Sequence, residues 1–142
     1  MGGLGTYVLR RRAALHAVVS IAIVAAIGLA GTPAADAAAA GATLSVSHSW
    51  QDGFIAHFAV TNSSAAPLND WKLEFDMPAG QSISHMWNGT FAQYGTHWVV
   101  SPANWNRTIA PGASATGGFR GVLTGPYSPP LNCQLNRQYL CT

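Results

Sequence analysis

The stretch Phe54-Ile55-Ala56-His57-Phe58-Ala59-Val60-Thr61 decides how this chain folds. Its largest apolar side chains fall at every second position, which is the period of a strand with one buried face. The same alternation recurs over residues 71–76 (WKLEFD), with the apolar residues at the odd positions. We therefore expect two strands that bury Phe54 and Phe58 in one case and Trp71 in the other.

Turn signals separate these and further short apolar runs. They are rich in Gly, Pro, Asn and Asp, and they fall at residues 51–53, 62–64, 78–80, 88–89, 94–95 and 111–112. No segment after Ala40 combines helical periodicity with helix caps. The pattern predicts an all-β antiparallel β-sandwich of the immunoglobulin-like or jelly-roll type, with about eight or nine short strands. We expect the last strand near residues 134–136, after an extended crossing over 125–130.

The N-terminus has the organisation of a targeting segment. Three arginines at 10–12 precede an almost wholly apolar run from 13 to 30, and Ala35-Asp36-Ala37 fits a small-x-small cleavage site. We expect a secretory signal peptide over residues 1–37, a secreted protein, and a single domain over residues 38–142. An uncleaved membrane anchor is the alternative, because the run is nearly long enough to span a bilayer. The choice between general and twin-arginine export stays open.

The charge of the expected domain excludes several partners. The whole chain carries a formal +2, and residues 1–37 hold three arginines against Asp36, which is also +2, so the remainder is neutral. A neutral surface argues against nucleic acid, and against a membrane once the signal is removed. It suits an uncharged ligand.

The chain has two cysteines, Cys133 and Cys141. In an exported protein such a pair predicts a disulfide, here one that staples the C-terminal tail. Closing so short a loop contributes about 2–3 kcal/mol in the chain-entropy description. The spacing fits no common zinc pattern, and we expect no metal and no cofactor.

Three tryptophans lie in polar, turn-like segments rather than in apolar runs: Trp50, Trp87 and Trp105. A tryptophan buries about 150–250 Å² in a core or interface. Leaving three of them among Asn, Gly, Asp and Gln indicates that something flat from outside the chain covers them, and a sugar ring has such a face. The alternative is that all three turn inward and anchor loops.

Several segments together resemble family 2 carbohydrate-binding modules, the cellulose- and chitin-binding sandwiches attached to many bacterial glycoside hydrolases. The resemblance runs in order and with similar spacing through residues 49–54 (SWQDGF), 60–64 (VTNSS), 70–75 (DWKLEF), 86–90 (MWNGT), 104–112 (NWNRTIAPG) and 118–121 (GFRG).

The resemblance implies that Trp50, Trp87 and Trp105 form a planar row that stacks on the sugar rings of an insoluble polysaccharide, cellulose first and chitin next. It implies that Trp71 is a core residue and that Trp98 faces inward, although Trp98 could instead extend the row. In the family, the orientation of one tryptophan separates crystalline-cellulose binders from xylan binders, and Arg or Gly packed under that ring matters to the orientation. The sequence alone does not place that residue, so the preference among cellulose, chitin and xylan stays open.

Three histidines occupy positions where the family has sugar-binding Asn and Gln: His48, His57 and His85. Imidazole donates and accepts hydrogen bonds, so these residues could still bind sugar hydroxyls. With an ordinary pKa near ~6.5 they could also make binding depend on pH. A three-histidine metal site and simple solvated strand positions are the alternatives. Asn88 and Asn104 flank the tryptophans and could add hydrogen bonds or only shape turns, and the same holds for Asn106.

The cysteines depart from the family, which commonly ties its two ends together. The first family cysteine aligns with Gly41, and Cys141 aligns with the second. The resemblance therefore implies a Cys133–Cys141 bridge and an N-terminal strand that is not pinned, with the order of residues up to about Thr43 in doubt.

We expect no catalysis. Glu74 and Asp76 would project from one face of a strand, about 6.5–7 Å apart, within the range of inverting glycosidases. Their alternation with apolar residues beside Lys72 instead predicts a solvated sheet face. The expected protein is a monomeric, free-standing binding module. The alternatives are an accessory part of a glycoside hydrolase, and a secreted protein-interaction module that uses the same aromatic face. Three formal glycosylation sequons, at Asn62, Asn88 and Asn106, are interpreted as turn chemistry.

Overall fold

The computed structural model describes residues 39–142. The expected signal peptide over residues 1–37 lies outside the described residues. Within residues 39–142 no helix is long and apolar enough to cross a membrane.

The described chain folds into strands joined by turns, as the alternating pattern predicts. In chain order these are β1 (Ala40–Trp50), β2 (Gly53–Asn62), β3 (Leu68–Asn69), β4 (Leu73–Asp76), β5 (Gln81–Trp87), β6 (Gly89–Tyr94), β7 (His97–Pro102), β8 (Thr108–Ile109), β9 (Ser114–Leu123), β10 (Leu131–Leu135) and β11 (Tyr139–Leu140). Three of them, β3, β8 and β11, are only two residues long. The longer strands agree with the expected number.

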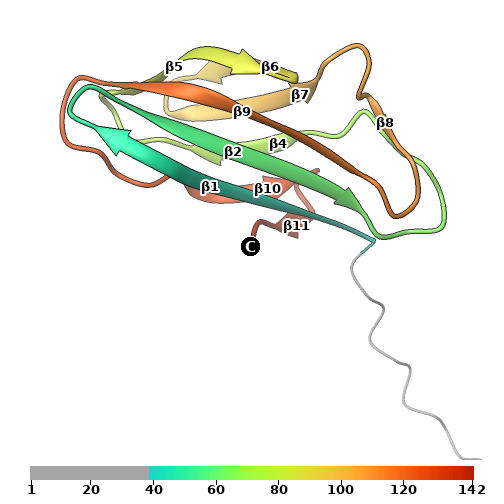
Figure 1. The fold of residues 1–142 in the computed structure, drawn as a ribbon. Coiled ribbons are helices and arrows are strands. Elements are labelled where there is room, and N and C mark those ends of the chain that lie inside the picture. The colour runs from blue at the N-terminus through green and yellow to red at the C-terminus, as the bar shows by residue number, and fades with distance from the viewer. Residues whose placement is uncertain (1–38) are drawn as a thin grey trace, which may run out of the picture. The chain divides into compact units, whose positions relative to one another are not determined.

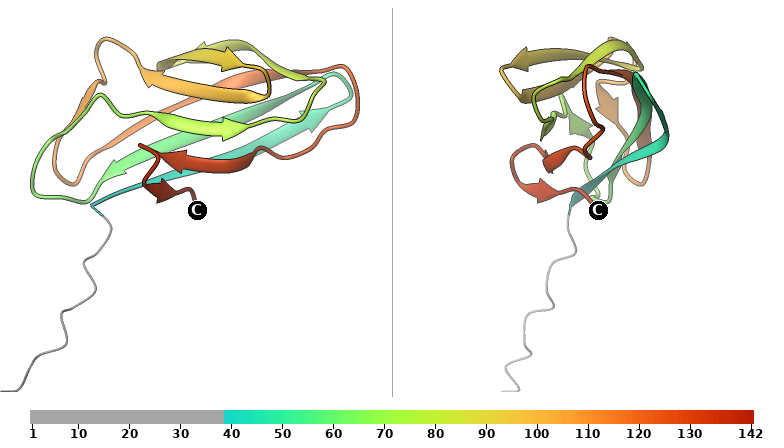
Figure 2. Two further views of the ribbon diagram at one scale, coloured as in Figure 1. Left: turned by 180° about the vertical axis from the view of Figure 1, so that it is seen from behind. Right: turned by 90° about the vertical axis from the view of Figure 1, so that its left-hand side faces the viewer.

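The strands form two antiparallel layers. One sheet has the order β1-β2-β9-β5 and the other the order β11-β10-β4-β7-β6, while β3 and β8 make a separate short ladder. Figure 1 shows β1, β2 and β9 toward the viewer, and the reverse view in Figure 2 brings β4, β7 and β10 to the front. The predicted β-sandwich is confirmed.

The core lies between the layers and is rich in aromatic side chains. Phe54 and Phe58 of β2 point into it, and Trp71 and Trp98 are at most 1% exposed. Phe75 of β4 stacks on Phe119 of β9, with ring centroids 5.6 Å apart, which joins the two sheets directly. The inward positions expected for Trp71 and Trp98 are therefore confirmed. Burying this much aromatic surface is the main stabilising contribution to the fold.

The chain passes from one sheet to the other at Asn88, between β5 and β6. Asn88 has a φ of 59°, in the left-handed region that asparagine tolerates better than most residues. Its side-chain amide donates a hydrogen bond of 2.9 Å to the carbonyl oxygen of Thr116 on β9. The corner fixes where β5 ends, and with it the position of the preceding residue, Trp87.

Two of the sequon asparagines are structural. Asn62 is fully buried, and its Nδ2 donates to the carbonyl oxygens of Ala66 at 2.7 Å and Ile109 at 2.9 Å. Asn106 is 8% exposed. The burial of both side chains fits the interpretation of these motifs as turn chemistry, which stays a prediction.

The C-terminal segment corrects one expectation and confirms another. The last strand was expected near residues 134–136, but β10 ends at Leu135, and Asn136 and Arg137 form the turn that leads into β11. The bridge between Cys133 and Cys141 closes this hairpin, as expected.

The N-terminal strand is ordered without a covalent tie. Ala40 already pairs with Asn62 of β2, and the backbone N–H of Thr142 donates to the carbonyl oxygen of Ala42 at 3.0 Å. The expected uncertainty up to Thr43 is therefore wrong, because the hydrogen bonds of a full ladder replace the missing bridge.

Candidate functional site

Trp50 and Trp87 lie on the outer face of the four-stranded sheet, each against a glycine of a neighbouring strand. Trp50 pairs with Gly53, and a Cβ atom on Gly53 would lie 2.7 Å from Cζ2 of the Trp50 indole. Trp87 pairs with Gly118 of β9, where a Cβ atom would overlap the indole of Trp87. Only glycine leaves room for a large ring this close to the strand backbone. Each indole is thus held against the sheet, with its outer side partly exposed.

Arg120 of β9 lies beside Trp50 on the same face. Its guanidinium carbon is 5.7 Å from the centroid of the Trp50 ring, within the range of a cation–π contact. Arg120 pairs across the sheet with Ile55 on one side and with His85 on the other. It therefore lies on one of the two strands between the edge strands β1 and β5, which bear Trp50 and Trp87.

Trp105 is the most exposed of the three tryptophans at this site, with 71% of its surface accessible. It lies between β7 and β8, next to Asn106, which is held from two sides. Nδ2 of Asn106 donates to the carbonyl oxygen of Asn88 at 2.7 Å, and the indole N–H of Trp71 donates to the carbonyl oxygen of Asn106 at 2.9 Å. Since Asn88 directly follows Trp87, these bonds attach the Trp105 segment to the edge of the sheet that bears Trp87.

The three predicted histidines lie on this face and contact the tryptophans. The ring centroids of His57 and Trp87 are 5.9 Å apart at an angle of 68°, and those of His85 and Trp87 are 6.4 Å apart. His48 lies 5.7 Å from Trp50. Nε2 of His57 lies 3.1 Å from Oγ of Ser47, which orients the ring. In residues 39–142 no group of three or more His, Cys, Asp or Glu could hold a metal.

Asn88 and Asn104, the two asparagines predicted to bind the ligand, differ in whether their side chains are already hydrogen-bonded within the protein. Asn88 uses its Nδ2 for the bond to Thr116, so its side chain holds the corner between the sheets. Asn104 is exposed beside Trp105.

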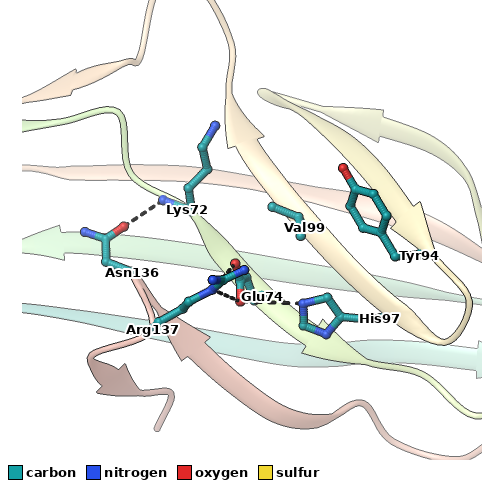
Figure 3. A pocket seen from close by; sticks show the side chains of 7 residues that line it. All are labelled: Lys72, Glu74, Tyr94, His97, Val99, Asn136 and Arg137. Carbon is teal, nitrogen blue, oxygen red and sulfur yellow. Dashed lines mark hydrogen bonds and ion pairs between the residues drawn. The ribbon is translucent and has the colours of Figure 1, made fainter.

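The opposite sheet contains the two acids that were considered for catalysis. Glu74 was expected on a solvated face, but it is only 5% exposed, because Arg137 covers it and donates from Nε to both of its carboxylate oxygens at 3.0 and 3.1 Å. His97 adds a contact of 3.5 Å from Nε2 to Glu74 (Figure 3).

Asp76 is also held by partners. Asn132 donates to it at 2.8 Å and His97 lies 2.7 Å away, and these two hydrogen bonds lower the pKa of the Asp76 carboxyl below its ordinary value. A general acid needs the opposite, a pKa raised by desolvation. The sequence reasoning missed this ionic cluster because Arg137 is distant in sequence from Glu74.

An antiparallel β-sandwich with indole rings held on one outer face has the construction of a carbohydrate-binding module, in which flat aromatic surfaces meet the apolar faces of sugar rings. The chain belongs to the cellulose binding domain family, whose model matches residues 40–141. The resemblance seen in the sequence is thereby confirmed.

The relatives include whole proteins and enzyme parts. A cellulose/chitin binding protein of Mycobacterium tuberculosis is 68% identical over 142 residues, which cover 100% of both chains. Chitinase C of Streptomyces lividans is 38% identical over 126 residues, which cover 89% of this chain but 20% of that enzyme. The similarity to the enzyme thus concerns a small part of it.

Solved structures of carbohydrate-binding domains have a similar fold. The chitin-binding domain of Chi18aC from Streptomyces coelicolor is 39% identical, with a TM-score of 0.59, and the match covers 70% of this chain and 92% of that domain. A cellulose-binding family 2 carbohydrate binding domain is 28% identical, with a TM-score of 0.56 and coverage of 67% and 94%. The domain is therefore a carbohydrate-binding module and not a catalytic domain.

Proposed function

We propose that the chain binds an insoluble neutral polysaccharide, cellulose or chitin, through Trp50, Trp87 and Trp105. The observation that carries this proposal is the position of the rings. Two indoles lie against glycines on one open sheet face, and the third projects beside them from a segment that is hydrogen-bonded to the same edge. Such an open aromatic surface suits a polymer that is itself flat.

The physical basis is the stacking of sugar rings on indoles. The axial C–H groups of a β-linked pyranose make its face apolar, and each ring contributes on the order of 1 kcal/mol beyond the area it buries. The glycan is uncharged, which fits the neutral domain predicted for residues 38–142. His48, His57 and His85, together with the exposed Asn104, supply donors and acceptors for the hydroxyl groups at the edges of the sugar rings.

The family resemblance connects Arg or Gly under one tryptophan with the choice between xylan and cellulose, and both residue types lie at Trp50. Gly53 lies against Trp50, although the guanidinium of Arg120 also approaches that ring. The names of the relatives, which include both cellulose/chitin binding proteins and chitinases, support chitin as an equal candidate.

The proposal also concerns where the protein acts. Removal of residues 1–37 as a signal peptide would release a monomeric, secreted domain with no attachment to the membrane. Mass spectrometry of the protein from culture medium tests this directly, because the expected N-terminal residue is Ala38. Retention of the whole chain in the cell membrane would contradict it.

The test of binding uses residues 38–142, a range that contains all the described strands, the core and the disulfide. The domain is mixed with microcrystalline cellulose, chitin and insoluble xylan, and the bound fraction is measured beside the release of reducing sugar. Trp50→Ala, Trp87→Ala and Trp105→Ala should each weaken binding roughly fivefold or more, on the basis of about 1 kcal/mol per ring.

Leu140→Ala is the matched control, because Leu140 is an equally exposed apolar residue at 77% and lies on the other sheet. It should leave binding unchanged. Sugar release in the same tubes would contradict a purely binding function. If none of the three polysaccharides retained the domain, the aromatic face would instead be assigned to a protein partner.

A further inference from the structure

The outer face of the five-stranded sheet contains a hollow of about 710 Å³, which is separate from the tryptophan face. It is lined by Lys72, Glu74, Tyr94, His97, Val99, Asn136 and Arg137. Figure 3 shows Lys72 and Tyr94 standing on either side of Val99, while Arg137 and His97 approach Glu74 from two directions. The side chains come from β4 and the residue just before it, Lys72, from β6 and β7, and from the turn between β10 and β11.

The hollow arises from the sizes of side chains that are neighbours across the strands. Val99 of β7 pairs with Ala92 of β6 on one side and with Glu74 of β4 on the other. Val99 is short and forms a low floor of the hollow. Tyr94, two residues along the same face of β6, is 68% exposed and stands above that floor as one wall.

The opposite wall is built at an energetic cost. Asn136 and Arg137 have φ values of 52° and 55°, the left-handed pair that a tight hairpin turn requires. Glycine is the usual residue at the second of these positions, and arginine there is strained. A glycine would leave the buried carboxylate of Glu74 without Arg137. The Arg137 side chain is 75% exposed, so solvent screens its ion pair with Glu74 and limits what the pair contributes to stability.

This wall is also rigidly attached. The Cys133–Cys141 disulfide closes the hairpin whose turn contains Asn136 and Arg137. Asn136 binds the backbone of Lys72 twice, because its N–H donates to the carbonyl oxygen and its Oδ1 accepts from the N–H, both at 2.8 Å. The hairpin is therefore fixed against β4 at the rim of the hollow.

The groups left for a ligand are mainly donors. Arg137 uses Nε for Glu74, so both Nη groups of a side chain that is 75% exposed remain to donate. The ammonium of Lys72 gives one of its three donors to Oγ of Ser101 at 2.8 Å. The carboxylate of Glu74, in contrast, is already satisfied. The hollow thus has two cations, of which only Arg137 contacts Glu74, opposite an exposed aromatic ring.

We propose that this hollow binds an acidic sugar, a pyranose ring that bears a carboxylate. The ring of Tyr94 stacks on the sugar face, and Arg137 and Lys72 bind the carboxylate by charge-assisted hydrogen bonds. The ligand class differs from the neutral polymer proposed for the tryptophan face, and the site does not depend on that proposal.

The test is a titration of residues 38–142 with tri-galacturonate, followed by the chemical shifts of assigned backbone amides. Shifts should saturate at Glu74, Val99 and Arg137 and be absent at Gly118. Cellotriose, a neutral trimer, should produce no saturating shifts at the hollow. Raising the salt concentration should weaken the binding of tri-galacturonate, because the contacts are ionic.

Two exposed variants separate the site from the fold. Tyr94→Ala should weaken tri-galacturonate binding at least about tenfold and Lys72→Gln about threefold or more, while retention on cellulose or chitin stays as in the parent. Trp105→Ala is the reciprocal control: it should weaken retention on cellulose or chitin and leave the affinity for tri-galacturonate unchanged. The proposal is overturned by absence of saturable binding, by equal binding of cellotriose, or by full affinity in both Tyr94→Ala and Lys72→Gln. A failure of the tryptophan variants alone would affect only the polysaccharide proposal.

Discussion

The side chain of Asn106 joins the segment that carries Trp105 to the corner that follows Trp87, because its amide donates to the carbonyl oxygen of Asn88 at 2.7 Å. Trp87 ends β5 whereas Trp105 lies in the turn between β7 and β8, and this bond joins the two segments. The indole N–H of Trp71 holds the same residue from the core side.

Asn106→Ala should therefore make the segment that carries Trp105 more mobile, while Trp50, Trp87 and Trp105 themselves stay unsubstituted. Loss of the buried amide should lower the free energy of unfolding by about 1–2 kcal/mol and leave the carbonyl of Asn88 without its partner. Retention on the preferred polysaccharide should fall. Asn132→Ala, on the other sheet, removes a comparable side chain and should not affect retention. Equal retention in both variants would show that the bond does not position Trp105.

The glycines beneath the indoles give a second prediction. A Cβ atom at Gly53 would lie 2.7 Å from the Trp50 indole and 2.8 Å from the carbonyl oxygen of Gly121, so Gly53→Ala should displace the ring from the sheet. Binding to crystalline cellulose should weaken several-fold, as judged by adsorption isotherms. Gly125→Ala is the matched control, since nothing lies within 4 Å of its added carbon. The two variants should differ, and equal isotherms would reject the proposed seat of Trp50.

The disulfide gives a third prediction, because it lies at the five-stranded sheet, which contains the hollow, and not at the sheet that bears Trp50 and Trp87. The double substitution Cys133→Ser and Cys141→Ser should cost about 2–3 kcal/mol of stability, which lowers the Tm by roughly ten degrees or more. At a temperature where both forms are folded, tri-galacturonate binding should weaken while retention on polysaccharide stays the same. Parallel loss of both activities would mean that the bridge supports the whole sandwich rather than the hairpin.

The acid side of the stability profile depends on Asp76. The hydrogen bond from Asn132 is the largest cause that lowers the pKa of Asp76, and the hydrogen bond with His97 is the next largest. A group with a depressed folded-state pKa stabilises the fold above its unfolded pKa, here 3.8, and loses this contribution as the pH falls through the folded value. Asn132→Ala should therefore lower the Tm more near about pH 7 than in acid; the strain of alanine at the left-handed φ of 53° adds a cost that does not vary with pH. Thermal unfolding followed by circular dichroism checks this, and a difference in Tm that did not shrink in acid would contradict it.

Much of the architecture could be predicted from local pattern. The alternation around Phe54 and Phe58 reports burial on one side of a strand, and this depends only on the period of the strand. Trp71 and Trp98 follow the same rule, and the cysteine pairing was limited by there being two cysteines. The histidines and tryptophans could be assigned to one face only through the family resemblance, since their proximity depends on how β1, β2, β9 and β5 pair.

Glu74 shows why the rest could not be predicted. Alternation places it on the outer face correctly, but it does not show that Arg137 folds back over it. That contact depends on the turn at Asn136, which the sequence pattern assigned to a strand. The hollow likewise depends on three strands whose order in the sheet differs from their order in the chain. The sequence did contain one signal of the Glu74 contact: arginine instead of glycine follows Asn136 in a tight turn. The signal can be interpreted only when Glu74 is known to be the partner of Arg137.

The two outer faces of the sandwich point away from each other, with a core about 10 Å thick between the sheets. A molecule lying with its indoles on a fibre would turn Tyr94, Lys72 and Arg137 toward the surrounding medium. A neutral fibre coated in this way would acquire a new surface chemistry, able to collect acidic glycans that have no affinity for the bare polymer. If both proposed sites bind as described, the protein would link a neutral polymer to an acidic glycan.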